Sequence, residues 1–224
     1  MAIGDEPKIP GFGNGVQKDT SSGKGFNIYE TLSFLKTLSL FLIAAFFLRA
    51  SVVEAYKIPS GSMIPTLLVG DHILVSKLAF GFRLPLVTEM LYQYSTPKRG
   101  DVVVFTRPDD PQTPYEDESK INIIKRIIGL PDDIVEVRGT EVLIDNQPYS
   151  EEYVRWEDNG IPEGNFGPEK IPAGTVLLLG DNRDQSRDSR FWTNHFLDMK
   201  RIKGKAFMIY WSSDDFRRIG KIIR

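Results

Sequence analysis

The stretch Ile-Asn-Ile-Ile-Lys-Arg-Ile-Ile, residues 121–128, is dominated by β-branched isoleucine and indicates a strand. Similar apolar runs follow one another along most of the chain, at residues 52–58, 72–78, 102–106, 134–137, 142–144, 176–179 and 206–211. Glycine, proline and Asp-Asn turn signals separate these runs. Short strands at close spacing favour an antiparallel sheet over alternating strands and helices. The predicted fold class is therefore mainly β, with residues 54–224 as one antiparallel β domain.

The N-terminal part of the chain lacks such strands. Residues 1–30 are rich in Gly, Lys, Asp and Ser, which predicts a flexible tail. Residues 31–53 are mostly apolar, and residues 32–53 alone would as a helix be about 33 Å long, enough for a hydrocarbon core of about 30 Å. We therefore expect one transmembrane helix there. A cleaved signal peptide and a core helix are the alternatives, but no convincing cleavage site follows the segment.

Composition excludes several function classes. The chain has 224 residues, a formal net charge of −2, no cysteine and two histidines. The absence of cysteine removes thiol catalysis, disulfides and thiolate metal sites. Two histidines make an imidazole metal site improbable, so we expect no metal and no cofactor. The slightly acidic balance gives no basic footprint for nucleic acid, so no nucleic-acid partner is expected.

Two motifs indicate nucleophilic catalysis. Ser62 lies in Pro-Ser-Gly-Ser-Met-Ile-Pro-Thr, residues 59–66, and Lys125 lies in the isoleucine-rich strand. A serine becomes a nucleophile only when a base takes its proton, and a lysine becomes that base only when burial lowers its pKa. Taken alone, Ser62 could be a turn residue and Lys125 could extend its amine to water. Together they predict a Ser/Lys dyad.

A third motif is dense in polar side chains. Residues 180–192, Gly-Asp-Asn-Arg-Asp-Gln-Ser-Arg-Asp-Ser-Arg-Phe-Trp, follow an apolar run. A solvated loop of alternating charge is one interpretation. Its Asp and Arg side chains could instead pair across turns and form a rigid platform. From such a platform, Ser186 could hydrogen-bond an amine and orient it.

These motifs resemble those of bacterial type I signal peptidase, also called leader peptidase. The matching segments are residues 59–71, 71–81, 125–133 and 180–192, in that order, and the resemblance covers most of residues 50–211. It implies a membrane-anchored, mainly antiparallel β protein. It also implies a serine endopeptidase that removes signal peptides from exported preproteins.

The resemblance implies a role for each matching residue. Ser62 would be the nucleophile and Lys125 the general base. The Ser60 hydroxyl would complete an oxyanion hole with the Ser62 backbone N–H, and Ser186 would orient the lysine amine. The implied supporting ion pairs are Arg126 with Asp181 and Asp188 with Arg190. The implied substrate-pocket residues are Ile58, Pro59 and Ile124.

Localisation and specificity also follow from the resemblance. Charges flanking the apolar segment are balanced and do not fix its orientation. The family implies a single pass through the bacterial cytoplasmic membrane, with the tail cytoplasmic and residues 54–224 on the extracytoplasmic side. The expected partners are secreted preproteins and the phospholipid membrane. A substrate bound as an added strand would point alternate side chains into apolar pockets, which predicts cleavage after Ala-x-Ala.

Three features depart from the better-known Gram-negative pattern. That pattern often has two membrane spans, whereas one is visible here. The insert at residues 147–173 is short and irregular in composition, so a large second β domain is not expected. Asp132-Asp133 follows Pro131 where the family commonly has Gly-Asp, which leaves the geometry of that turn open.

Other functions fit the sequence less well. A self-cleaving Ser/Lys repressor would carry a DNA-binding helix-turn-helix in place of the tail and apolar segment. A penicillin-binding enzyme needs S-D-N and K-T-G motifs, and a Ser/His/Asp hydrolase of the α/β type needs G-x-S-x-G; all are absent. A conjugation-type or organellar processing peptidase stays open. So does a non-catalytic anchored β module that presents a peptide-binding edge.

Overall fold

The computed structural model describes residues 28–83, 90–106, 122–156 and 164–224. The chain divides into two units, Met1–Leu42 and Ile43–Arg224. Nearly all of the predicted tail at residues 1–30 lies outside the described residues. A polar, proline-bearing segment at residues 109–119, for which an exposed loop is expected, also lies outside them.

Helix α1, Ile28–Ser51, coincides with most of the predicted apolar segment. Its 24 residues would extend about 36 Å. The stretch Ile28–Phe46 has a mean hydropathy of 1.4, and none of it is buried. The Thr37 hydroxyl donates to the Ser33 carbonyl at 3.0 Å, so this polar group is satisfied within the helix. By length and composition, α1 can cross a membrane.

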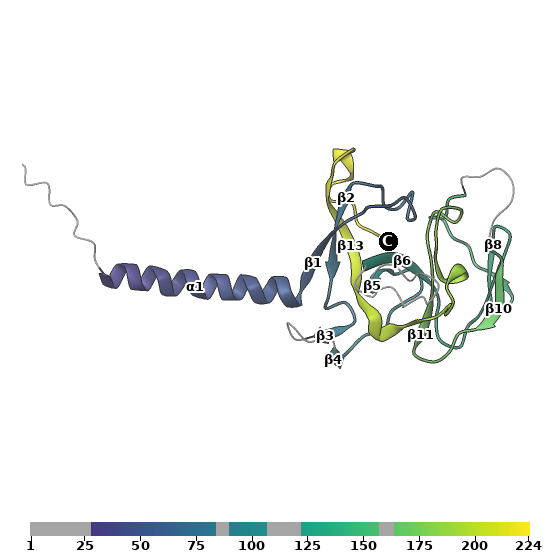
Figure 1. The fold of residues 1–224 in the computed structure, drawn as a ribbon, viewed down its shortest axis with the longest axis horizontal. Helices are drawn as coiled ribbons and strands as arrows, with labels where there is room; N and C mark the ends of the chain where they lie inside the picture. The colour runs from purple at the N-terminus through teal and green to yellow at the C-terminus, as the bar shows by residue number, and fades with distance from the viewer. Residues whose placement is uncertain (1–27, 84–89, 107–121, 157–163) are drawn as a thin grey trace, which may run out of the picture. The chain divides into compact units, whose positions relative to one another are not determined.

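An antiparallel seven-stranded sheet forms the centre of the second unit (Figure 1). Each pair of neighbouring strands is antiparallel. In spatial order, the strands are β1 (Val53–Lys57), β2 (Asp71–Ser76), β13 (Ile202–Ser212), β5 (Val102–Thr106), β6 (Asn122–Gly129), β11 (Thr175–Leu179) and β12 (Leu197–Asp198). The predicted mainly antiparallel β fold is confirmed, and each predicted run overlaps one of the strands of this sheet or of the next.

A second sheet has four strands, β7 to β10, which follow one another in the chain. Its spatial order is β10 (Phe166–Lys170), β7 (Ile134–Arg138), β8 (Glu141–Ile144) and β9 (Gln147–Pro148). The insert supplies β9 and β10, so the prediction of an irregular insert was wrong for these residues. Pairing with β7 and burial of Phe166 in the core account for β10. Strands β3 (Gly81–Arg83) and β4 (Met90–Gln93) form a separate two-stranded sheet.

The turn before β7 settles the geometry that the Asp132-Asp133 sequence left open. Asp132 has a φ of 73°, in the left-handed region that favours glycine. Aspartate tolerates this region better than most other side chains. The Asp133 carboxylate accepts the Leu130 N–H and pairs with Arg99 at 3.0 Å, which closes the turn. Asp132 therefore occupies a glycine-like conformation at the position where the family commonly has glycine.

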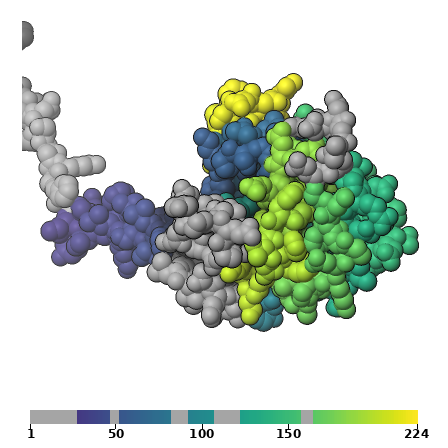
Figure 2. Space-filling model, turned by 45° about the vertical axis from the view of Figure 1, so that its right-hand side comes forward, coloured from purple at the N-terminus to yellow at the C-terminus, as the bar shows by residue number. Residues whose placement is uncertain are grey.

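The C-terminal segment packs against the start of β2 and the loop before it. Figure 2 shows this segment, in yellow, next to the blue residues of β1 and β2. Arg218 pairs with the buried Asp71 at 2.6 Å and donates to the Thr66 carbonyl at 2.9 Å. Short 3₁₀ helices occupy Ser189–Phe191 (η2), Met199–Arg201 (η3) and Phe216–Arg218 (η4). Through η4, the C-terminal segment secures the loop between β1 and β2.

Candidate active site

Ser62 and Lys125, 63 residues apart in sequence, meet in the folded chain. Lys125 Nζ donates to Ser62 Oγ at 2.7 Å, and the two residues are only 4% and 8% exposed. Burial lowers the pKa of Lys125 to about 8, although the carboxylates of Asp188 and Asp181 oppose this shift. A neutral amine at this distance can accept the serine proton. The arrangement can therefore generate a serine nucleophile near neutral pH.

The position of Lys125 in the sheet explains why its amine is buried. Strand β6 lies between β5 and β11, and residues 125–129 are all buried. Lys125 is paired with Val103, which has no exposed surface. A lysine at the end of an edge strand could extend its amine to water, but this central position prevents it.

The loop between β1 and β2 holds Ser62 in place. Its two ends are joined because the Ile58 N–H donates to the Asp71 carbonyl at 2.8 Å and the Gly70 N–H donates to the Ile58 carbonyl at 3.0 Å. Inside the loop, Met63 and Leu67 are fully buried in a hydrophobic cluster. The loop is therefore fixed both at its ends and on either side of its middle, which makes the position of Ser62 well defined.

The other residues predicted around the nucleophile lie on the same loop and on β6. Ser60 Oγ lies 3.5 Å from Ser62 Oγ, and Ser60 is exposed, so solvent can reach it. Pro59 is also exposed. Ile58 is buried in the cluster against which the half-buried Ile124 packs. These two isoleucines thus belong to one apolar cluster, which also contains Met63, the residue after Ser62.

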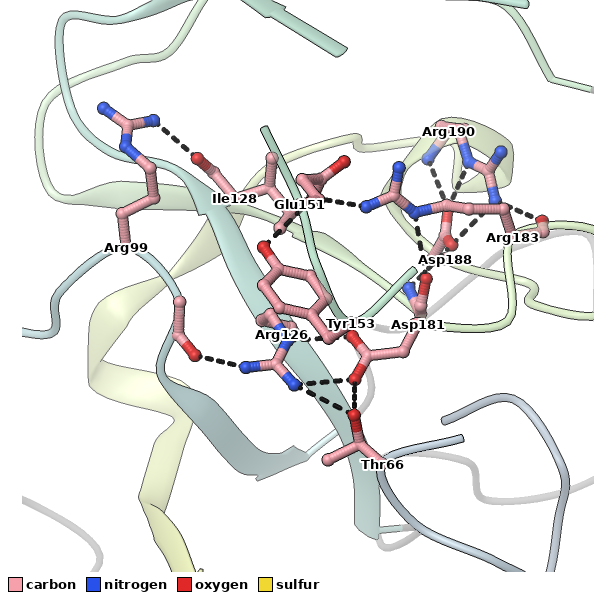
Figure 3. A network of polar contacts seen from close by, with 12 residues as sticks. Thr66, Arg99, Arg126, Ile128, Glu151, Tyr153, Asp181, Arg183, Asp188 and Arg190 are labelled. Atoms are coloured by element: carbon pink, nitrogen blue, oxygen red, sulfur yellow. Dashed lines mark hydrogen bonds and ion pairs between the residues drawn. The ribbon is translucent and has the colours of Figure 1, made fainter. Parts of the chain in front are cut away.

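Both predicted ion pairs are present in the interior of the protein (Figure 3). Arg126 binds Asp181 through two hydrogen bonds, Nε to Oδ1 at 2.8 Å and the second nitrogen to Oδ2 at 2.6 Å. Arg190 binds Asp188 in the same way, at 2.8 and 2.9 Å. Asp188 also accepts the Gly180 N–H at 3.0 Å. The first pair holds the segment after β11 against β6, and the second pair fixes the shape of that segment from within.

Ser186 lies close to the nucleophile loop but is not bonded to the lysine amine. It is 3% exposed, and a Cβ atom on Gly180 would lie 2.2 Å from its Oγ and 2.5 Å from the Ser62 carbonyl oxygen. The absence of a side chain at Gly180 thus lets the Ser186 and Ser62 segments approach. Within the described parts of the chain, the Ser186 hydroxyl has no hydrogen-bond partner. Its lysine-orienting role stays a prediction.

Comparison with known proteins identifies the family of the chain. The model of the signal peptidase family, peptidase S26, matches residues 31–211. The chain belongs to this family. Signal peptidase I of Leptolyngbya laminosa is 38% identical over 188 residues, which cover 83% of this chain and 82% of that protein. The Pseudomonas aeruginosa enzyme is 35% identical (85% and 77% covered), and that of Bacillus licheniformis 29% identical (91% and 99%). The predicted resemblance is confirmed.

The sequence analysis missed several residues that surround the Arg126–Asp181 ion pair. Thr66 accepts a hydrogen bond from Arg126 at 3.2 Å and donates to Asp181, which links the Ser62 loop to the ion pair. The guanidinium carbon of Arg126 lies 3.8 Å from the centroid of the Tyr153 ring, and the Tyr153 hydroxyl donates to Glu151. Thr66 stands inside the first motif, where its position was a signal. Glu151 and Tyr153 belong to the insert, where no sequence pattern marks them.

The described residues contain no cluster of side chains that could bind a metal ion. Among residues 28–83, 90–106, 122–156 and 164–224, no three His, Asp or Glu side chains group so that they could hold an ion. The acidic residues nearest the dyad, Asp181 and Asp188, are each engaged by an arginine.

Proposed function

We propose that this chain is a membrane-anchored serine endopeptidase that removes N-terminal signal peptides from exported preproteins. The observation that carries the proposal is the 2.7 Å contact between the buried Lys125 amine and the Ser62 hydroxyl, in a member of the signal peptidase family. Family membership supports the reaction and the substrate class. The contact supports the assignment of nucleophile and base.

In the acylation step, neutral Lys125 takes the proton from Ser62 as Oγ attacks the carbonyl carbon before the cut. The Ser62 backbone N–H and the Ser60 hydroxyl donate to the oxyanion that forms. The lysine ammonium then gives its proton to the nitrogen of the leaving mature protein, and the carbon–nitrogen bond breaks. The signal peptide is left as an ester on Ser62.

In the deacylation step, Lys125 takes a proton from a water molecule that attacks the ester carbonyl. The carbon–Oγ bond breaks, the proton returns to Ser62, and the signal peptide leaves as a carboxylic acid. The same amine therefore serves as base in both steps and as acid in both departures. Burial makes this possible because it lowers the pKa of Lys125 to about 8.

The two buried ion pairs would support the dyad without taking part in the chemistry. Arg126 and Asp181 are each 1% exposed, and Asp188 and Arg190 have fully buried side chains. Removing one partner would leave a buried charge, at a cost of about 3–5 kcal/mol. We assign these residues to positioning the segment after β11, and Ser186 to orienting the Lys125 amine.

Substrate choice would come from the apolar surface beside the dyad. Ile58 and Ile124 belong to one cluster, and Pro59 and Ser60 continue from Ile58 towards the nucleophile. A preprotein segment added as a strand would place its first and third side chains before the cut against this surface. Alanine fits pockets bounded by branched isoleucines, whereas the middle side chain would face away. The proposed specificity is cleavage after Ala-x-Ala.

The anchor and its orientation belong to the same proposal. Helix α1 would cross the bacterial cytoplasmic membrane once, with residues 54–224 on the extracytoplasmic side. Its apolar composition supports the crossing. Ser62 lies 14 residues after Leu48, so the nucleophile would act close to the membrane surface. This suits a substrate whose own apolar segment is still in the bilayer.

The test is cleavage of a purified preprotein by the purified full chain in detergent, with the products identified by mass spectrometry. We expect one cut after an Ala-x-Ala site. A library varied at the three positions before the cut then tests specificity. Efficient cutting after Arg, Phe or Leu, or equal selectivity at the middle position, would contradict the proposal. No cutting at all would favour the non-catalytic peptide-binding module.

A further inference from the structure

Asn182 forms two hydrogen bonds with the backbone around Ser62. It follows Asp181 in the segment after β11 and has no exposed surface. Its backbone N–H donates to the Ser62 carbonyl at 3.1 Å, and its side-chain Nδ2 donates to the Gly61 carbonyl at 3.2 Å. These two carbonyls belong to the peptide groups on either side of Ser62. One buried residue therefore holds both peptide groups of the proposed nucleophile.

The bond to Gly61 has a geometric consequence for the Ser62 N–H. The Gly61 carbonyl and the Ser62 N–H are parts of the same peptide group, which is planar and trans, so they point in opposite directions. A hydrogen bond that fixes the Gly61 carbonyl towards Asn182 therefore directs the Ser62 N–H to the opposite side. That N–H is the backbone donor of the proposed oxyanion hole.

We propose that Asn182 is a positioning residue that aims the Ser62 N–H at the oxyanion. This inference rests on the proposed function. Asn182 cannot touch the substrate, because its side chain is completely buried. It acts only through the orientation of the Gly61–Ser62 peptide. Catalysis depends on donors that are held in place before the oxyanion forms.

The backbone of Asn182 is itself held on both sides. The Arg155 N–H donates to the Asp181 carbonyl at 2.8 Å, and the Arg183 N–H donates to the Arg155 carbonyl at 3.0 Å. The bidentate bond from Arg126 fixes the neighbouring Asp181 side chain. The position from which Nδ2 reaches Gly61 is thus rigid, and the insert that carries Arg155 contributes to it.

The expected size of the effect follows from what remains when the side chain is removed. Loss of a whole oxyanion donor costs about 10²–10³ in kcat. The Gly61 carbonyl also accepts the Ile64 N–H at 3.1 Å, so its peptide would tilt rather than turn away. The Ser62 carbonyl keeps its bond to the Asn182 backbone. Asn182→Ala should therefore lower kcat by about tenfold, a partial loss of one donor.

The experiment measures steady-state cleavage by the full chain, wild type and variants. For Asn182→Ala we expect kcat to fall about tenfold and KM to stay within about twofold. Asn194→Ala is the matched control: this asparagine is exposed, its side chain accepts the Phe196 N–H, and its loss should change neither constant. If Asn182→Ala does not fold, Asn182→Asp keeps the shape and nearly the volume of the side chain, replaces the Nδ2 donor with an oxygen and is expected to give at least the same loss.

Inhibitor binding separates aiming of the donor from general loosening of the site. A peptide aldehyde ending in Ala-x-Ala forms a tetrahedral adduct with Ser62 whose oxygen occupies the oxyanion hole, whereas the product peptide does not. The inhibition constant of the aldehyde should rise about tenfold, in step with kcat, with product affinity unchanged. An unchanged kcat in both variants, or equal weakening of both ligands, would overturn the inference. Wild-type protein that cleaves nothing would overturn the proposed function itself.

Discussion

The proposed role of Lys125 as general base predicts a pH dependence of kcat/KM that follows the pKa of its buried amine. Burial lowers the pKa of this amine from 10.5 to about 8. At pH 7, an amine with a pKa of 10.5 is about 0.03% neutral, whereas an amine with a pKa of 8 is about 9% neutral. The fraction of the amine that can act as a base is therefore about 300-fold larger. Because the neutral form is active, activity falls as pH falls. We expect about 1% of the plateau at pH 6, a tenfold rise per pH unit, and a plateau well above pH 8.

The assay measures kcat/KM on an Ala-x-Ala peptide from about pH 5.5 to 10 at constant ionic strength, because kcat/KM reports the free enzyme. Thermal unfolding at each pH separates titration from loss of the fold. Ser60→Ala serves as the control, since it should lower the plateau without moving the midpoint. A flat profile between pH 6 and 9 would refute Lys125 as the base. A midpoint above about pH 10 would refute its desolvation.

Further substitutions test other parts of the site. Ser60→Ala should lower kcat by about 10²–10³ with a smaller change in KM, measured by steady-state kinetics, and Ser60→Thr should retain part of the rate; equal kcat would exclude the oxyanion role. Ile124→Ala should admit bulkier residues at the first or third position before the cut, measured with a peptide library; an unchanged profile would remove Ile124 from the pockets. Gly180→Ala would place a Cβ 2.2 Å from Ser186 Oγ and 2.5 Å from the Ser62 carbonyl oxygen, so activity should fall more than tenfold while the β fold persists by circular dichroism; wild-type activity would mean that the two segments need not approach.

Most of the fold was predictable because its central strands are rich in β-branched residues. Burial on both faces makes such strands visible as apolar runs, as in β6. Strand β10, Phe-Gly-Pro-Glu-Lys, has no β-branched residue and exists because it pairs with β7. Strand β12 has only two residues. Both depend on tertiary contacts that local sequence does not carry.

The candidate site was predictable only where a residue contrasts with its surroundings. Lys125 is conspicuous as a charge among isoleucines, and Ser62 lies in a motif of Gly and Pro. Asn182 and Thr66 stand inside two of the motifs, but the sequence does not show what they contact, because their partners are 121 and 115 residues away in the chain. Glu151 and Tyr153 stand in an insert without pattern. Only the folded chain reveals that these residues support the nucleophile loop.

The most direct test of the Ser/Lys dyad is preprotein cleavage by wild type, Ser62→Ala, Lys125→Ala and the double variant, with circular dichroism to establish that each is folded. The account predicts that both single variants lose cleavage and that the double variant is hardly worse than either, because the two residues act as a unit. Near wild-type turnover by a folded Ser62→Ala or Lys125→Ala protein would contradict it.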